Sequence, residues 1–457
     1  MTANRPLRVA IIGAGPAGTY AADILSKTDL NVSIDILERL PAPFGLVRYG
    51  VAPDHPRIKQ IIVALANVLG RGDIRFLGNV NIGTDLTLQD LREHYDAVIF
   101  ATGSFKDADL DIPGIDLDGS YGAADFVSWF DGHPDVPRTW PLEAKEVAVL
   151  GVGNVALDVA RILAKHPADL MSTEIPANVE EGLKASPCTD VHVFGRRGPA
   201  QVKFTPLELR ELGQVPDVDV VVYPEDYDFD DASIEAAETN KQTKQVVKTL
   251  TDWTLREPGT ASHRIHLHLL QQPVEILGED GKVAGIRMER TALQGDASVK
   301  GTGEFIDYPV QAVYRAVGYW GTEIEGIPFD DRKGVIRNEG GRVVDASGEQ
   351  VPGYYATGWI KRGPVGLIGH TKSDAQETIA NLVADADDLY ANTQAHAEQL
   401  SPDNLLRLLK SRDVPVVEWS GWEALDAYER ALGEGEDRER IKVVPREEMT
   451  DIALGRD

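Results

Sequence analysis

Apolar runs and helix-like segments alternate at the beginning of the chain. The run LRVAIIG, residues 7–13, is followed by AGTYAADILSK, in which apolar residues recur at helical spacing, and then by a second apolar run, VSIDILE, residues 32–38. Strand, helix and strand in this order form a β–α–β unit with parallel strands. The pattern therefore predicts an α/β fold built on a parallel sheet.

A second alternation of the same kind starts near residue 146. The segment EVAVLGVGNVALDVARIL, residues 146–163, again places an apolar run and a glycine-rich turn before a helical pattern, and DVHVFGRRG, residues 190–198, supplies the next strand. A chain of 457 residues is also too long for one ordinary core. We therefore expect two Rossmann-like dinucleotide-binding domains with parallel sheets.

A long connection rich in Pro and Gly follows the first unit. It reads RLPAPFGLVRYGVAPDHPRIK, residues 39–59, and leads into a helix expected near 57–70. Connections of this length are usually either functional or disordered. Phe44, Val47 and Tyr49 make this one apolar, so we expect an ordered loop that covers a ligand.

Two apolar runs end in the same small residues. YDAVIFATGS, residues 95–104, and GYYATG, residues 353–358, both close on Ala-Thr-Gly, and a long helix is expected after the second. Between them, residues 219–258 are acidic and then helical in pattern. Both Ala-Thr-Gly runs are expected to be buried strands.

The last sixty or so residues are expected to be mainly helical. There SGWE, residues 420–423, has the form of a capping box, and Trp422, Leu425 and Leu432 would lie on roughly one helical face. No chemistry can be assigned to this part of the chain from its residues.

Composition narrows the class of protein. Cys188 is the only cysteine, so the chain has no C-x-x-C redox pair and no four-cysteine iron–sulfur site, and redox chemistry requires a bound cofactor. The net charge of −27 argues against nucleic-acid binding. No apolar run reaches about 18 residues, so no membrane span is expected. The first glycine turn lies close to Met1, which leaves no room for a targeting peptide and favours a cytoplasmic protein.

The first glycine-rich turn has the spacing of a dinucleotide site. Gly13 allows the tight turn, Gly15 lets the backbone approach a pyrophosphate, and Gly18 lets the helix pack closely on the strand. Glu38 ends the second strand, where a carboxylate accepts hydrogen bonds from both hydroxyls of an unphosphorylated ribose. The unit predicts a dinucleotide without a 2′-phosphate.

The second turn differs at the sugar. Gly151, Gly153 and Ala156 keep the same frame, but the next strand ends in Arg196 and Arg197, with no acid in the place of Glu38. Two guanidiniums pair well with a 2′-phosphate, although a solvated basic turn would show the same residues. The second nucleotide is expected to be NADP(H), and FAD together with NADPH fits the pair of sites.

Seven segments occur in an order that identifies a family. GAGPAG, GLVRYGVAPDHP, ATGS, GNVALDVARIL, GRRGP, FTPLELREL and GWIKRGPVGLIGHTKSDA closely resemble adrenodoxin reductase-type ferredoxin–NADP reductases, including bacterial members, over roughly residues 7–380. The resemblance implies an FAD domain in two segments, 1–106 and 331–457, the second with a helical C-terminal extension. The NADP-binding domain, 107–330, is inserted between them.

The resemblance also implies which residues contact the nucleotides, in addition to the glycines of the two turns. With those glycines included, the FAD set is Gly13, Gly15, Ala17, Gly18, Glu38, Leu46, Val80, Trp359, Gly366, Leu367 and Ile368. The NADP set is Gly151, Gly153, Asn154, Val155, Ala156, Leu157, Arg196, Arg197, Glu208 and Gly366.

Two further residues match positions that the family places near the flavin and the nicotinamide, His55 in APDHP and Glu211 in LELREL. A histidine beside a carboxylate can orient groups or relay protons around a flavin. Hydride transfer needs no general base, so the expected role is modest. By residue type alone, His55 is equally a structural loop histidine and Trp359 a core aromatic.

The resemblance implies a small iron–sulfur ferredoxin as electron acceptor. Ferredoxins are usually acidic, and so is this chain, so docking requires a local basic surface. Lys241, Lys244 and Lys248 lie on one helical face, and Arg210 belongs to a region that similar proteins use for docking. An ordinary solvated lysine face has the same pattern.

Other classes fit less well. A thioredoxin reductase needs a C-x-x-C pair, and a glutamate synthase small subunit typically adds a cysteine-rich cluster segment; both are absent here. An NADPH oxidase or flavin monooxygenase would consume oxygen without another acceptor. A nucleotide-sensing module would bind NADPH without turnover.

Overall fold

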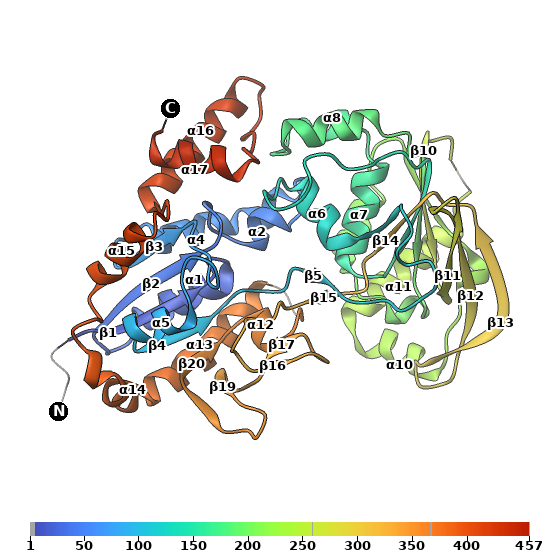
Figure 1. Cartoon of the computed structure of the whole chain (residues 1–457). Coiled ribbons are helices and arrows are strands. Elements are labelled where there is room, and N and C mark those ends of the chain that lie inside the picture. Colours follow the sequence, from blue (N-terminus) through green and yellow to red (C-terminus); the bar gives the residue numbers. More distant parts are fainter. Residues whose placement is uncertain (1–4, 258, 366–367, 457) are drawn as a thin grey trace. The chain divides into compact units, whose positions relative to one another are not determined.

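The computed structural model describes residues 5–257, 259–365 and 368–456. The chain divides into two compact units (Figure 1). The first unit comprises residues 1–106, 131–135 and 319–457, and the second unit comprises 107–130 and 136–318. Residues 319–330, which were expected in the inserted domain, belong to the first unit, where the Tyr319 ring lies 6.2 Å from that of Trp359.

The first unit is built on an eight-stranded sheet in the order β18-β19-β20-β4-β1-β2-β3-β21. The strands from β20 to β3 run parallel, and antiparallel strands complete both edges. The strands are β1 (Leu7–Ile12), β2 (Val32–Glu38), β3 (Ile74–Gly78), β4 (Ala97–Phe100), β18 (Asn338–Glu339), β19 (Arg342–Val344), β20 (Gln350–Ala356) and β21 (Val417–Glu418), and β16 (Phe329–Asp330) pairs with β17 (Val335–Ile336) outside this sheet.

Helices cover both faces of this sheet, because its central strands are apolar on both faces. In β1, Val9 and Ile11 join one core cluster, while Ala10 and Ile12 join the cluster on the opposite face. The helices of the first unit are α1 (Pro16–Leu25), α2 (Leu46–Tyr49), α3 (Pro56–Lys59), α4 (Ile61–Leu69), α5 (Leu88–His94), α12 (Trp359–Arg362), α13 (Ile368–Ala384), α14 (Ala386–Thr393), α15 (Pro402–Ser411), α16 (Trp419–Glu434) and α17 (Arg446–Leu454).

The second unit contains a six-stranded parallel sheet in the order β6-β14-β7-β8-β10-β9 and a three-stranded antiparallel sheet, β11-β12-β13. The strands are β6 (Ser120–Gly122), β7 (Glu146–Leu150), β8 (Asp190–Phe194), β9 (Val218–Val222), β10 (His263–His268), β11 (Gln271–Glu279), β12 (Lys282–Leu293), β13 (Val299–Tyr308) and β14 (Ala312–Arg315). The helices are α6 (Ala123–Phe130), α7 (Asn154–Ala164), α8 (Ala177–Ala185), α9 (Pro206–Leu212), α10 (Asp231–Thr239) and α11 (Lys241–Thr254).

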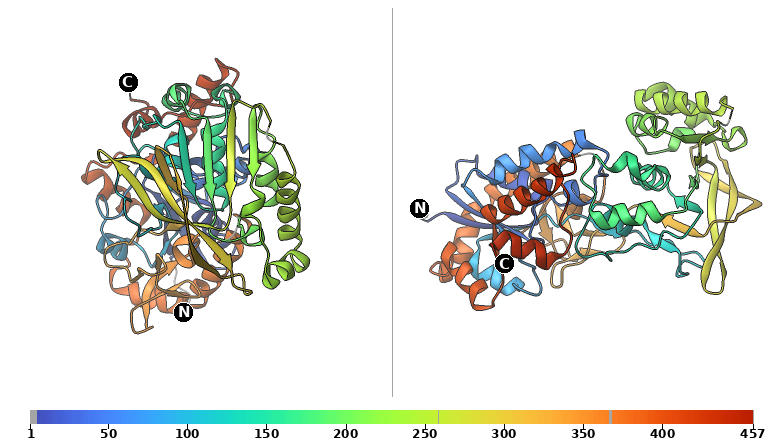
Figure 2. Two further views of the ribbon diagram at one scale, coloured as in Figure 1. Left: turned by 90° about the vertical axis from the view of Figure 1, so that its right-hand side faces the viewer. Right: turned by 90° about the horizontal axis from the view of Figure 1, so that it is seen from above.

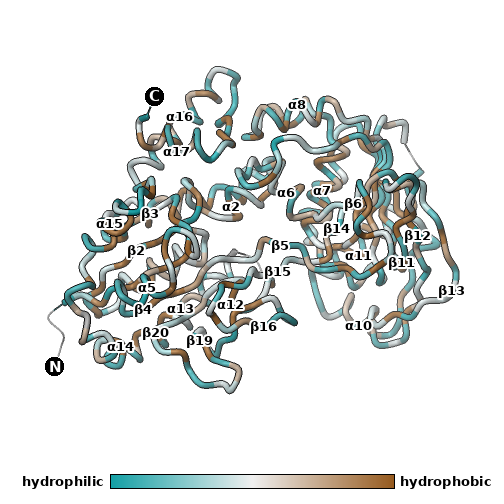
Figure 3. Tube along the Cα trace, in the orientation of Figure 1, coloured by the Kyte–Doolittle hydropathy of each residue, from teal (hydrophilic) through white to brown (hydrophobic). Residues whose placement is uncertain are grey.

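The two sheets of the second unit share a core. Ala148 and Leu150 of β7 and Phe194 of β8 belong to the same apolar cluster as Ile286 and Met288 of β12. The three-stranded sheet crosses one face of the parallel sheet, as the left view of Figure 2 shows. In Figure 3 the hydrophobic colour lies mainly on the strands of both units, while the connecting loops are mostly hydrophilic.

The predicted α/β class with two parallel sheets is confirmed, and so is the helical C-terminal part. The prediction of a capping box at residues 420–423 is wrong. Helix α16 already begins at Trp419, because β21 pairs with β3 up to Glu418 and the chain turns directly into the helix. Ser420 therefore lies inside the first turn, and Leu432, expected on the packed face, is exposed.

Search of the described residues finds no helix with both the length and the apolar character needed to cross a bilayer.

Candidate functional site

The first glycine turn joins β1 to α1 in a conformation that only glycine adopts easily. Gly13 has φ of +110°, and a Cβ atom there would lie 2.5 Å from the carbonyl oxygen of Ala101. A Cβ at Gly18 would lie 2.0 Å from the Gly13 oxygen. Strand, turn and helix are thus packed against each other through backbone atoms, which leaves the amide groups at the start of α1 facing outward for a ligand.

Glu38 stands beside this turn at the end of β2. Its carboxylate accepts hydrogen bonds from the Ala14 amide at 2.8 Å and the Leu40 amide at 3.1 Å. Burial raises the pKa of the Glu38 carboxyl, although these amides act in the opposite direction. Val80 lies next to it, since the Val80 amide donates to the Glu38 carbonyl at 2.9 Å.

The loop before α2 closes over the turn from another direction. The Phe44 amide donates to the Ala14 carbonyl at 2.9 Å, and a Cβ at Gly45 would lie 3.1 Å from the Gly15 Cα. Phe44 has φ of +82°, a strained value for a bulky residue. Leu46 follows as the first residue of α2, so the predicted ordered loop does reach the glycine turn.

The second Ala-Thr-Gly sequence brings a third segment to the same place. A Cβ at Gly358, which has φ of +76°, would lie 2.5 Å from the Cβ of Ala17. Asp374 of α13 fixes this approach by accepting from the Gly358 amide at 2.5 Å and from the Thr357 hydroxyl at 3.1 Å. Trp359, half-buried, is the next residue and begins α12.

The structure thus gathers most of the expected FAD residues around one turn. Gly366 and Leu367 lie outside the described residues, and Ile368 begins α13. Whether the gathered residues contact FAD stays a prediction.

The C-terminal region supports this turn, which sequence analysis did not foresee. Glu429 of α16 is fully buried and holds the buried Arg48 of α2 through two hydrogen bonds, of 3.0 and 2.5 Å. The Val443 amide also donates to Glu429, at 3.0 Å. The Lys442 ammonium donates to the Arg48 carbonyl at 2.7 Å. Helix α2 and its loop are therefore held by residues close to the end of the chain.

An aromatic contact adds to this support. The Trp422 ring packs edge-on against Phe44 with centroids 5.5 Å apart, and the Arg48 guanidinium lies over the same tryptophan. The strained Phe44 is thus held from the C-terminal side. A sequence signal existed, since Trp422 was predicted to lie on a packed face, but its partner could not be identified from helical periodicity.

The second glycine turn has the same backbone arrangement as the first, with fewer segments packed around it. Gly151 has φ of +138°, and a Cβ there would lie 2.2 Å from the carbonyl oxygen of Ala316, at the end of β14. At Gly153 a Cβ would meet nothing within 4 Å, so the backbone is open for the close approach of a phosphate. Ala156 takes the third position and is buried.

One loop steadies this turn. The Lys203 amide donates to the Val152 carbonyl at 2.8 Å, and the Thr205 amide donates to the Asn154 side-chain oxygen at 2.9 Å. Asn154, Val155, Ala156 and Leu157 form the first turn of α7, so their backbone amides are placed at the positive end of that helix.

Arg196 and Arg197 follow β8 directly beyond the turn. Gly195 touches the turn, since a Cβ there would lie 2.6 Å from Val152. Arg196 is exposed and Arg197 half-buried, and neither guanidinium makes a hydrogen bond or ion pair with any described residue. Two unpaired cations in so acidic a chain are available to an anionic ligand.

The remaining candidates lie in both units. His55 is buried in the first unit directly before α3. Glu208 and Glu211 belong to α9 of the second unit, where Glu208 is buried, with a carboxylate oxygen 4.0 Å from the Arg161 guanidinium, and Glu211 is half-buried. The roles of His55 and Glu211 stay predictions.

The basic face of α11 is as exposed as expected. Lys241, Lys244 and Lys248 are exposed while Val246, Leu250 and Trp253 pack inward, and Lys248 pairs with Asp252 at 2.6 Å. Helix α9, which carries the exposed Arg210, packs on α11, since a Cβ at Gly213 would lie 2.5 Å from Trp253. We call Arg210, Lys241, Lys244 and Lys248 the basic patch.

Comparison with known proteins identifies relatives that match nearly the whole chain. The family profile described as "Pyridine nucleotide-disulphide oxidoreductase" matches residues 7–196. NADPH-ferredoxin reductase FprA of Mycobacterium tuberculosis is 41% identical over 99% of this chain and 100% of its own. The mitochondrial NADPH:adrenodoxin oxidoreductase of Arabidopsis thaliana is 38% identical over 98% of this chain and 95% of its own.

Solved structures give the same result. FprA from Mycobacterium tuberculosis in complex with NADPH has a TM-score of 0.89 to this chain, at 41% identity, and covers 99% of this chain and 100% of that chain. The likeness therefore extends through both units and the C-terminal region, and does not depend on the glycine turns alone.

Proposed function

The chain belongs to the adrenodoxin reductase-type ferredoxin–NADP reductases, and we propose that it moves electrons between NADP(H) and a ferredoxin with FAD as its resident cofactor. The observation that carries the proposal is the contrast at the two sugar positions. Glu38 ends the strand beside the first turn, whereas Arg196 and Arg197, which have no ionic partner among the described residues, follow the strand beside the second.

FAD fits the first turn. A Cβ at Gly15 would meet only the Gly45 Cα, at 3.8 Å, so the backbone there is open to a pyrophosphate. Each carboxylate oxygen of Glu38 holds one amide donor and keeps accepting capacity for ribose hydroxyls. Leu46, Val80 and Trp359 supply apolar surface around it.

NADP(H) fits the second turn. The α7 amides and the open Gly153 receive the pyrophosphate, and the two guanidiniums receive the 2′-phosphate. Bound FAD supplies the chemistry, because it takes a hydride from NADPH and passes single electrons to an iron–sulfur acceptor. His55 and Glu211 orient polar groups near the two rings and supply no obligatory proton.

The basic patch is the proposed docking surface for ferredoxin. Lys241, Lys244 and Arg210 have no acidic partner among the described residues, so their charge is not neutralised locally. In a chain of net charge −27, such a local positive surface is what an acidic partner requires.

The proposed function is tested by reduction of cytochrome c with NADPH, with and without an added ferredoxin. Purified protein is expected to be yellow, to bleach on addition of NADPH, and to reduce cytochrome c many times faster when ferredoxin is present. A protein that binds NADPH without bleaching would be a sensor, and rapid oxygen consumption with no gain from ferredoxin would indicate an oxidase. Either result contradicts the proposal.

The docking surface is tested by charge reversal. Lys241→Glu together with Lys244→Glu is expected to raise the KM for ferredoxin about tenfold at low salt and less at high salt, because exposed charges are screened. Reduction of a small dye by NADPH should not change. A matched control reverses Lys282, an exposed lysine at the start of β12. Equal losses with ferredoxin and dye would contradict the assignment.

A further inference from the structure

A group of potential metal ligands lies at the amino-terminal edge of the parallel sheet in the second unit. His263 is the first residue of β10, Asp217 directly precedes β9, and His166 follows α7. Helix α7 starts at the glycine turn, at the carboxyl end of β7, and runs back along the sheet. Its last residues therefore arrive at the opposite edge, where β9 and β10 begin.

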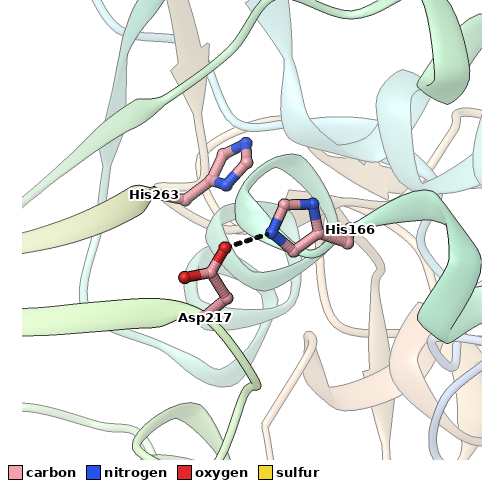
Figure 4. A group of neighbouring side chains, drawn as sticks. All are labelled: His166, Asp217 and His263. Carbon is pink, nitrogen blue, oxygen red and sulfur yellow. Dashed lines mark hydrogen bonds and ion pairs between the residues drawn. The ribbon is translucent and has the colours of Figure 1, made fainter. Parts of the chain in front are cut away.

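The three side chains converge on one point (Figure 4). The Nε2 atom of His166 lies 2.8 Å from a carboxylate oxygen of Asp217, and the rings of His166 and His263 stand edge to face with centroids 4.4 Å apart. One nitrogen or oxygen from each residue lies within 4.8 Å of the other two. Ligands of a tetrahedral zinc ion lie about 3.3 Å apart, from bond lengths of about 2.0–2.1 Å. The separation between His166 and Asp217 is about 0.5 Å shorter than that value, and no pair of the three atoms is more than 4.8 Å apart.

The aspartate is held in place before any ion arrives. Asp217 has φ of +53°, and its carboxylate accepts from the Ser262 amide at 3.1 Å and the Ser262 hydroxyl at 2.5 Å.

We propose that His166, Asp217 and His263 bind a divalent transition cation of the zinc class, with water in the remaining position. Two imidazole nitrogens and one carboxylate are typical ligands for Zn²⁺, whereas Mg²⁺ and Ca²⁺ prefer oxygen ligands alone. The ion joins three segments that are distant in sequence. It lies at the edge opposite the glycine turn, so binding stabilises the second unit without changing electron transfer.

A hydrogen-bonded cluster without metal is the competing explanation. Substitution of His263 distinguishes the two explanations. His263 contributes one side-chain bond to this cluster, between its Nδ1 atom and the Ser262 hydroxyl at 2.8 Å, whereas the bonds of Asp217 to His166 and to Ser262 do not involve the His263 side chain. In His263→Ala, a cluster that only holds the loops together therefore loses one bond and keeps those of Asp217, while a metal site loses one of its three protein ligands and with it the affinity for zinc.

The test is calorimetric titration of the full-length holoprotein with zinc chloride near neutral pH, after treatment with a chelator. We expect one zinc ion per chain and a rise in the melting temperature on binding. His263→Ala and His166→Ala should each weaken binding by at least about tenfold. His370→Ala, which removes an exposed histidine of the first unit, is the matched control and should bind as the wild type does.

Two further measurements keep the result decisive. Melting of each variant without metal shows whether it is folded, and His263→Gln replaces any variant that is not. Cobalt in place of zinc should give visible bands at longer wavelength than the flavin, and His263→Ala should abolish them. The proposal is overturned if the wild type binds zinc only at millimolar concentrations, or if His263→Ala and His263→Gln bind zinc as tightly as the wild type.

Discussion

The two glycine turns of this protein use the same backbone device and differ in what surrounds it. Gly13 and Gly151 both have positive φ, and at each a Cβ would collide with the carbonyl oxygen of an alanine that ends a neighbouring strand, Ala101 or Ala316. The first turn is enclosed by the α2 loop, by Gly358 and, behind the loop, by the C-terminal region. The second is held by the loop that contains Lys203 and Thr205 and by close contacts with Gly195 and Ala316.

The side chains expected to bind the ribose of each nucleotide differ between the two turns in the same way. Glu38 is buried and bonded to backbone amides, which suits a nucleotide that stays bound. Arg196 is exposed and unpaired among the described residues, which suits a nucleotide that arrives and leaves. The glycine motif thus predicts a dinucleotide, whereas residues outside the motif are expected to determine which dinucleotide binds and how long it stays bound.

The largest effect is expected from adding one methyl group to either turn. Gly13→Ala should yield protein without flavin, and Gly151→Ala should keep the flavin and lose at least about a hundredfold in NADPH affinity, since strain and collision together cost about 3 kcal/mol or more. Flavin absorbance and NADPH titration measure the two outcomes. Gly281→Ala, at a positive φ with open space around it, controls for backbone strain alone. Loss of both nucleotides in both variants would contradict two independent turns.

Removing the charge of Glu429 should destabilise the first turn alone. Glu429→Gln leaves the buried Arg48 without its anion, which costs about 3–5 kcal/mol. Denaturant unfolding should show this loss, and flavin fluorescence should show faster release of FAD. Glu434→Gln, an exposed residue of the same helix, is the control. Unchanged release of FAD would remove the C-terminal region from this role.

Lowering the pH should reduce the free energy of unfolding of both units, because each contains a buried histidine that resists protonation in the folded state. Burial lowers the pKa of His133, in the first unit, to about 4, and that of His192, in the second, to about 3. The unfolded chain takes up protons below the ordinary value of 6.5 and the folded chain does not, so stability falls from there until the folded pKa is reached. The loss of unfolding free energy amounts to about 3–5 kcal/mol per histidine.

Hydrogen exchange at several pH values can follow the two units separately. His133→Asn should reduce the loss of stability of the first unit at acid pH, and His192→Asn should reduce that of the second unit. If either substitution reduced the acid-induced loss of stability equally in both units, the two units would not respond independently to pH.

The smallest of these effects is expected from the arginines that are proposed to bind the 2′-phosphate of NADP(H) beside the second turn. Arg196→Ala and Arg197→Ala each remove a charge-assisted hydrogen bond of about 1.5–3 kcal/mol, so preference for NADPH over NADH should narrow about ten- to a hundredfold. The ratio of kcat/KM for the two nucleotides measures this. Arg256→Ala, an exposed residue at the end of α11, should leave the ratio unchanged. A constant ratio in the two arginine variants would exclude them from recognition.

Sequence analysis predicted the parts of this fold that depend on local backbone chemistry. The two glycine turns, the strands that precede them and the exposed face of α11 follow from spacing and periodicity, and the structure has them. The chain also brings Ala17, Leu46, Val80 and Trp359 around one turn, although no pattern in the residues relates those segments to each other. That expectation came from family resemblance.

Contacts made by the C-terminal region could not be predicted. Arg48 and Glu429 are 381 residues apart, and buried charges carry no periodic signal that would connect them. The incorrect capping box has a related cause. Pairing of β21 with β3 sets where α16 begins, and such long-range pairing overrides a local four-residue pattern.

The contact between Arg48 and Glu429 also determines the order in which the molecule can be completed during synthesis. The glycine turn emerges from the ribosome early, yet Glu429 and Lys442, which hold its α2 loop, follow Arg48 by 381 and 394 residues. The segments of the second unit have all been translated by then. Stable loading of the flavin is therefore expected only after Glu429 has been translated, and a nascent protein stalled before residue 429 would carry an unfinished pocket.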